Sequence, residues 1–200
     1  MKKRISFFLA AVCLLAAFLV LPIHGEAEIY DNVIRLHVLA ESDSGEDQAL
    51  KLKVRDAVIA EGEALLANAT DKEQAQQILQ ASLDRIREAA QNAVYREGSQ
   101  AAVSVALGKE SYPTRRYEAV ALPAGEYLSL QVKIGEAQGQ NWWCVLFPPL
   151  CLSAASAENE TTCLSCGLTE EQYHLIADSD STKYKLRFKI LEVAQGFFAA

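Results

Sequence analysis

Residues 34–58, IRLHVLAESDSGEDQALKLKVRDAV, decide the fold of this chain. Residues 33–40 are a short apolar run rich in β-branched side chains, which predicts a strand. Residues 41–45 are turn formers that end the run. Asp43 or Ser44 can cap a following helix, because each has an acid three positions later. Apolar residues then recur at helical spacing, so the stretch predicts a strand, a tight acidic turn and an amphipathic helix.

A second helical pattern follows at residues 70–97. Thr70 and Glu73 have the spacing of a capping box, and Gly98 suits the position just past a helix end. Between them the apolar residues keep a period of about 3.6, and the other positions are polar. We therefore expect the longest helix of the chain here, lying on the surface of the domain.

The pattern then changes to strands and turns. Strands are predicted at residues 103–107, 114–122, 127–134, 142–147 and 184–193. The run at 142–147 is continuously apolar, which predicts a central strand buried on both faces. Residues 153–162 suggest a polar loop, and residues 169–177 a short helix. This order favours an α+β domain, a mainly antiparallel sheet of about five strands with two long helices packed on one face.

Residues 1–27 have the pattern of a signal or anchor helix. Residues 2–4 are basic, residues 5–23 are apolar apart from Ser6, and small residues precede a cleavage position after Ala27. The apolar run is long for a signal peptide and about long enough to span a bilayer. A cleaved signal peptide and an uncleaved membrane anchor therefore both stay open. Either places the rest, a single α+β domain at residues 28–195, outside the cytoplasm.

The net charge of the chain argues against some classes of partner. The formal net charge is −7 at pH 7, and residues 2–4 account for three of the basic side chains. An acidic domain without a basic stripe argues against nucleic acid as a partner. It also argues against electrostatic binding to an anionic membrane surface. We expect contact with a membrane only through the N-terminal segment, if that segment is not cleaved.

The cysteines permit several arrangements. Cys13 lies in the targeting segment, and the other four, Cys144, Cys151, Cys163 and Cys166, allow three pairings. Disulfides are permitted in an exported protein. The two prolines between Cys144 and Cys151 suit a turn that could bring these cysteines within bonding reach. Cys163 and Cys166 form a CxxC, which fits a small local disulfide or free thiols better than a zinc site or a redox centre.

The chain shows no recognisable catalytic set. It contains neither an HExxH motif nor a GxSxG motif. Asp43, Glu46 and Asp47 lack the spacing of a calcium loop and are explained by helix capping. His37 lies in an apolar strand and is interpreted as a structural histidine. We therefore expect no metal, no cofactor and no enzymatic activity, and we favour a binding or signalling protein.

Two groups of residues are candidates for contact with a partner protein. In a strand, Trp142 and Trp143 point to opposite faces, so one of them can be an exposed anchor in an interface. Lys51 and Arg55 lie on the expected solvated face of the first helix. Together with Asp43 in the acidic turn, they form a candidate charged docking surface.

Three stretches resemble a known family, stage II sporulation protein R, the secreted sporulation signal of endospore-forming bacteria. They are residues 34–58, residues 122–127 (LPAGEY) and residues 139–151 (GQNWWCVLFPPLC). The resemblance covers a core at residues 33–152, which leaves residues 153–200 as a variable C-terminal part.

The resemblance implies a function. Proteins of this family are exported from the forespore into the space between forespore and mother cell. There they are needed to activate a membrane-embedded aspartic protease of the mother cell, which cuts the precursor of the factor sigma-E. Two alternatives stay open: an exported hydrolase or cell-wall-binding domain with its site at the acidic turn, residues 41–47, and a redox protein that uses Cys163 and Cys166.

Overall fold

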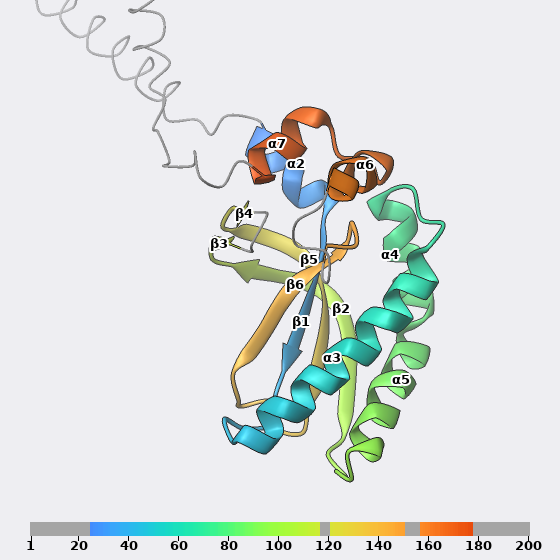
Figure 1. The fold of residues 1–200 in the computed structure, drawn as a ribbon, viewed down its shortest axis with the longest axis vertical. Helices are drawn as coiled ribbons and strands as arrows, with labels where there is room; N and C mark the ends of the chain where they lie inside the picture. Colours follow the sequence, from blue (N-terminus) through green and yellow to red (C-terminus); the bar gives the residue numbers. More distant parts are fainter. Residues whose placement is uncertain (1–24, 117–120, 151–156, 178–200) are drawn as a thin grey trace, which may run out of the picture.

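A four-stranded sheet forms the centre of the protein (Figure 1). The structure is a computed structural model that describes residues 25–116, 121–150 and 157–177. The strands lie in the order β2-β5-β1-β6. Their bounds are β1 (Ile34–Leu39), β2 (Val103–Tyr112), β5 (Gly125–Ile134) and β6 (Asn141–Phe147).

The pairing of these strands corrects one expectation. β1 runs parallel to β5 and antiparallel to β6, and β2 runs antiparallel to β5. The α+β class is confirmed, but the sheet is mixed, with four strands where the sequence suggested about five in a mainly antiparallel sheet. Helices and β2 separate β1 from β5 in the chain, so no short hairpin forces these two strands to run in opposite directions.

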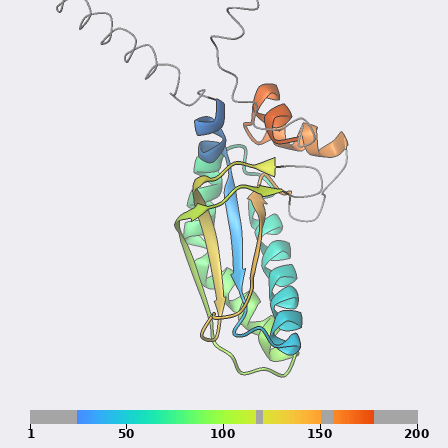
Figure 2. The ribbon, with the colours of Figure 1, turned by 90° about the vertical axis from the view of Figure 1, so that its left-hand side faces the viewer.

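Three helices cover one face of this sheet. They are α3 (Gly45–Leu66), α4 (Lys72–Ala81) and α5 (Leu83–Arg96). Figure 2 shows α3 and α5 behind the strands, with the other face of the sheet turned toward the viewer. Alternate residues of the strands and the apolar stripes of the helices share one core, which includes Leu36, Val38, Val54, Val58, Ile86, Leu130 and Val132.

The helix expected at residues 70–97 is two helices. Ser82 lies between α4 and α5 with a non-helical backbone, and its N–H bonds the Leu79 carbonyl oxygen. Serine favours such ends because its side chain competes for nearby backbone groups. The expected capping box also shifts by one residue: Asp71, not Thr70, caps α4 and accepts a hydrogen bond from the N–H of Gln74 at 2.8 Å. The longest described helix is therefore α3.

The tryptophan-containing strand β6 lies at an edge of the sheet, where the sequence predicted a central strand. Its apolar residues are buried because α3 packs on one side of it and a second apolar cluster on the other. That second cluster includes Val33, Tyr112, Leu122, Tyr127, Val145, Cys163, Leu168 and Ile176. β6 is therefore buried on its two faces by two separate apolar clusters, although it has a neighbouring strand on one side only.

Shorter elements gather at one end of the sheet (Figure 1). They are α2 (Gly25–Asn32), β3 (Arg115–Arg116), β4 (Ala121–Leu122), α6 (Ala157–Ser165) and α7 (Glu170–Ala177). The strand expected at residues 114–122 is reduced to the pair β3 and β4, which forms its own two-stranded sheet.

Two predictions for the C-terminal part have different outcomes. The loop expected at residues 153–162 is partly wrong, because α6 begins at Ala157, whereas α7 confirms the short helix at residues 169–177. The final strand expected at residues 184–193 lies outside the described residues, as does the targeting segment except for residues 25–27 in α2. Within the described ranges, no helix has both the length and the apolar character needed to cross a membrane.

Candidate functional site

We call the face of the sheet opposite α3 and α5 the open face (Figure 2). Leu36 and Val38 of β1 belong to the helix-covered core, so the alternating residues Arg35 and His37 point to the open face. The register places His37 opposite Gln131 of β5 on one side and opposite Trp143 of β6 on the other. A row of side chains from several strands therefore crosses the open face at the level of His37.

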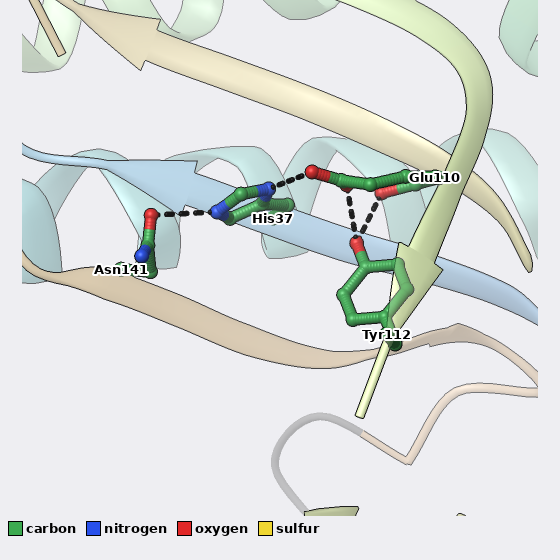
Figure 3. Close-up of polar contacts among 5 residues, drawn as sticks. His37, Glu110, Tyr112 and Asn141 are labelled. Atoms are coloured by element: carbon green, nitrogen blue, oxygen red, sulfur yellow. Dashed lines mark hydrogen bonds and ion pairs between the residues drawn. The ribbon is translucent and has the colours of Figure 1, made fainter. Parts of the chain in front are cut away.

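His37 is the centre of a hydrogen-bonded network on this face (Figure 3). It is only 6% exposed. Its Nδ1 lies 2.8 Å from Oε1 of Glu110, and its Nε2 lies 2.8 Å from Oδ1 of Asn141. Both neighbours are oxygens as placed here, so both ring nitrogens donate when the imidazole is protonated. The interpretation of His37 as a structural histidine with satisfied nitrogens is confirmed.

Tyr112 extends the network into the protein. Its hydroxyl donates to Oε2 of Glu110 at 2.7 Å and lies 2.6 Å from Oγ of Ser129. Burial, together with the neighbouring Glu110 carboxylate, raises the pKa of Tyr112 above its ordinary value, so the phenol is neutral at physiological pH. The guanidinium of Arg35, fully buried, lies 3.9 Å from the centre of the Tyr112 ring.

This arrangement ties β1 to β2 and β6 through side chains. Ser129 is fully buried and its hydroxyl contacts Tyr112, so it is not placed as a nucleophile. Among residues 25–116, 121–150 and 157–177, no three His, Cys, Asp or Glu side chains are grouped so that they could hold a metal ion. The network can fix the orientation of Glu110 and Asn141 at the surface of the sheet.

Sequence reasoning missed five members of the network: Arg35, Glu110, Tyr112, Ser129 and Asn141. One signal was available for two of them. The alternation of β2 continues past Leu107, and residues two apart in a strand share a face, so Glu110 and Tyr112 follow Ala106 on the same side. No local pattern connects them with His37, because 73 residues separate His37 from Glu110.

All five residues proposed for partner contact lie around the start of β6. Lys51 is 5% exposed, and its ammonium donates to the carbonyl oxygen of Gln140 at 2.8 Å. Burial lowers the pKa of Lys51, and the Asp43 carboxylate partly opposes that effect. Asp43 accepts a hydrogen bond from the N–H of Gln140 at 2.7 Å. The expectation that Lys51 lies on a solvated helix face is therefore wrong, because it binds a turn from a distant part of the chain.

Each of the two tryptophans contacts an arginine. The guanidinium of Arg55 lies 4.3 Å from the centre of the Trp142 ring on the helix side of the sheet. The guanidinium of Arg115 lies 4.0 Å from the centre of the Trp143 ring, which packs with the second apolar cluster. Both tryptophans are half-buried. They point to opposite faces as expected, and neither is a fully exposed anchor.

Two acids of the turn at residues 41–47, Asp43 and Asp47, are hydrogen-bonded within the fold. Ser44 caps α3 by accepting a hydrogen bond from the N–H of Asp47 at 3.1 Å, which confirms the predicted helix start. The Asp47 carboxylate accepts a hydrogen bond from Ser42, and Asp43 binds Gln140. Both nitrogens of His37 are bound elsewhere, so the acids and His37 do not converge on a common site as the hydrolase alternative requires.

The cysteines divide into two kinds. Cys144 is disulfide-bonded; Cys151, one of the partners that the sequence permits, lies outside the described residues. Cys163 and Cys166 are free, buried thiols, so the CxxC contains no local disulfide in this structure. Burial, and to a lesser degree the proximity of Cys166, raises the pKa of Cys163 to about 12. Such a thiol is a poor nucleophile, which disfavours a redox centre here.

The fold and its network can now be compared with known proteins. The model of the family described as stage II sporulation protein R matches residues 30–157, which include all four strands of the sheet and the helices α3, α4 and α5. The chain belongs to the stage II sporulation protein R family. The resemblance found in the sequence is thereby confirmed, and the family places the protein in sporulation.

A curated relative supports the same assignment. Stage II sporulation protein R of Bacillus subtilis (strain 168) is 42% identical to this chain over 123 residues, which are 62% of this chain and 55% of the relative. The chain thus spans about half the length of the stage II sporulation protein R that it matches. No solved structure matches the chain.

Proposed function

We propose that the protein is an exported sporulation signal that activates a membrane-embedded aspartic protease of the mother cell, which then processes the sigma-E precursor. The observation that carries this proposal is the family match, which spans the whole helix-covered sheet at residues 30–157. The identity of 42% to a stage II sporulation protein R supports it. On this proposal the protein is made in the forespore and acts from outside the membrane of the mother cell.

The domain acts as a ligand, and the chemistry belongs to the protease. The hydrogen-bonded network supports this role. His37 is bonded to Glu110 and Asn141, and the hydroxyls of Tyr112 and Ser129 contact each other, so none of these three side chains is free to attack a substrate. A ligand activates an enzyme when it binds the active conformation more tightly than the inactive one. An interface of about 800 Å² on each partner is enough for specific binding.

A reconstitution in a non-sporulating bacterium tests the proposal. The host makes the sigma-E precursor, the membrane-embedded protease and this protein, and cleavage of the precursor is followed by immunoblot. The full chain is compared with a form that lacks residues 1–27. We expect cleavage only with the exported protein. Absence of cleavage with well-exported, folded protein would overturn the activator assignment.

The same assay tests the partner-binding residues near β6. Arg55 is half-buried and stacks on Trp142, whereas Lys53 is an exposed residue of the same helix without such a contact. We expect Arg55→Glu to lower cleavage more than Lys53→Glu does. Equal cleavage by the two folded variants would remove Arg55 from the proposed docking surface, and Trp142 and Trp143 would then be retained only for packing.

A further inference from the structure

We infer that the free edge of β2 binds an extended segment of the protease partner, which adds a strand to the sheet. The inference rests on the proposed function and adds a second contact surface to the one proposed around Arg55 and Trp142. β2 is the outermost strand on its side of the sheet and has ten residues. Its register with β5 is unbroken from Val103 to Tyr112. A sheet edge of this length exposes a row of backbone donors and acceptors.

The hydrogen bonds at the start of β2 show which backbone groups face outward. The N–H of Gly135, at the end of β5, donates to the carbonyl oxygen of Ala102. In an antiparallel pair, inward and outward backbone groups alternate, so the even-numbered residues of β2 face β5 and the odd-numbered ones face away. The N–H of Val103 agrees with this phase, because it donates to the side chain of Gln91 on α5.

Four outward-facing residues remain beyond Val103. They are Val105, Leu107, Lys109 and Ser111. Among the described residues, their backbone N–H and carbonyl groups take part in no hydrogen bond outside the strand. Only an extended backbone can satisfy alternate donors and acceptors along such a row. The geometry therefore specifies a strand as the occupant.

The edge of β2 lacks the features that protect natural edge strands. Such edges are commonly short, or interrupted by a proline or a bulge, or covered. β2 has no proline and no bulge, and Lys109 is its one basic residue. The opposite edge is different, because the N–H of Leu150 folds back onto the carbonyl oxygen of Val145 in β6. Among the residues that the structure describes, β2 is therefore the longer uninterrupted free edge of this sheet.

The side chains beside the edge select the occupant. Val105 and Leu107 are half-buried against the main core, so apolar residues of an added strand would extend that core. On the open face, Ala106 is small, and a Cβ added at Gly108 would meet no atom within 4 Å. Next to them the Glu110 side chain is 24% exposed. An extended segment with apolar residues on one face and a basic residue near Glu110 fits this edge.

Charge favours such a partner over a second copy of this chain. The chain carries a formal net charge of −7, so two copies repel each other at long range. A basic segment is attracted by the same field and by Glu110. On the proposed function the partner is the protease, so we assign the edge to a basic extended segment of the protease.

Proline substitution at an outward position tests the inference. Lys109 is exposed, and its N–H faces away from β5, so Lys109→Pro removes one outward donor and blocks the approach of a strand without breaking a bond to β5. Lys109→Ala loses the same charge but keeps the N–H group. We expect the proline variant to bind the solubilised protease at least about tenfold more weakly than the alanine variant, with a parallel loss of precursor cleavage.

Each outcome of this comparison decides the question. Equal binding by the folded Pro and Ala variants would overturn the edge inference and leave the activator function intact. A wild-type protein that neither binds the protease nor supports cleavage would overturn both. Self-association of the wild type that Lys109→Pro abolishes would assign the edge to a second copy and overturn the inference.

A measurement on the wild-type protein covers the case in which the proline variant does not fold. Residue-resolved amide hydrogen exchange is recorded with and without the protease. We expect the amides of Val105, Leu107 and Lys109 to become protected on binding, because they gain acceptors in the added strand. Unchanged exchange at these amides in a formed complex would overturn the inference.

Discussion

The ammonium of Lys51 on α3 donates a hydrogen bond to the carbonyl oxygen of Gln140, 89 residues later in the chain, at 2.8 Å. The N–H of Gln140 in turn donates to the Asp43 carboxylate at 2.7 Å. Two side chains from the turn and helix that follow β1 thus hold both sides of one residue at the start of β6. This contact aligns β6 with β1 at the end of the sheet where the acidic turn lies.

Replacement of Lys51 by methionine tests the contribution of this contact to stability. Lys51→Met leaves the carbonyl oxygen of Gln140 and the side chain of Gln48 without their donor. We expect the free energy of unfolding, measured by urea denaturation, to fall by about 1–3 kcal/mol. Lys53→Met on the exposed face of the same helix is the control and should change it by less than about 0.5 kcal/mol. Equal losses would show that the buried contact contributes nothing specific.

Gly139 lies where the turn between β5 and β6 touches the turn after β1. Its N–H donates to the carbonyl oxygen of Ala40 at 2.9 Å, and an added Cβ would lie 2.1 Å from the backbone oxygen of Ser42. Because that obstacle is backbone, Gly139→Ala must separate the two turns. We expect a loss of about 1–3 kcal/mol in the free energy of unfolding, of the size that overpacking causes.

Gly108 provides the matched control for this substitution. An added Cβ there meets no atom within 4 Å, and glycine is less favourable than alanine inside a strand. Gly108→Ala should therefore raise the thermal unfolding midpoint or leave it unchanged, in the same experiment in which Gly139→Ala lowers it. Destabilisation by both substitutions would contradict the tight contact at Gly139.

The pair formed by His37 and Glu110 should be energetically coupled. Their side chains are 8% and 24% exposed, so solvent screens them little. A double-mutant cycle with His37→Gln and Glu110→Gln should give a coupling free energy of about 1–2 kcal/mol near pH 6. The exposed pair of Lys109 and Glu126 is the control, with an expected coupling of about 0–1 kcal/mol. A smaller coupling for the buried pair than for the exposed one would argue against a rigid network.

Cys163 and Cys166 should be unreactive in the folded protein. The pKa of Cys163 is raised from 9.0 to about 12, so this thiol stays protonated at pH 8 and its nucleophilic thiolate is scarce. We expect iodoacetamide to modify neither thiol until the protein is unfolded in guanidinium chloride, as followed by mass spectrometry.

The same shift predicts how stability changes at alkaline pH. A group with a raised pKa keeps its proton in the folded state and loses it in the unfolded state, so stability falls as the pH rises from about 9 toward 12. Cys163→Ala should reduce that fall.

In the reconstitution, Cys166→Ser should retain cleavage of the sigma-E precursor, whereas a redox function would require complete loss of cleavage in this variant.

Local patterns predicted the elements whose signals lie within a few residues of one another. The strand at β1, the cap at Ser44 and the helix α3 follow from hydrophobic spacing and capping chemistry in one stretch. The break at Ser82 was missed because apolar spacing continues smoothly from α4 into α5. The edge position of β6 was missed because two separate cores bury an apolar strand as completely as two neighbouring strands do.

The candidate site was harder to predict, since it depends on contacts between distant parts of the chain. Lys51 has the local pattern of an exposed residue, and only the position of Gln140 makes it a buried one. His37 gave a correct local interpretation, but Glu110 and Asn141 come to it from two other strands. The parallel pairing of β1 with β5 is part of what brings these residues together, and no short turn in the sequence predicts that pairing.

The central place of β1 also sets when the domain can form. Ile34 pairs with Leu128 on one side and with Phe147 on the other. A chain made from its N-terminus presents β1 first, and the strand has no neighbour until β5 has been made; its other side stays unpaired until β6 follows. The helices that follow β1 have no sheet to pack against in the meantime. A polypeptide interrupted before residue 147 therefore cannot complete the four-stranded sheet, and a truncated product that lacks β6 leaves one side of β1 unpaired.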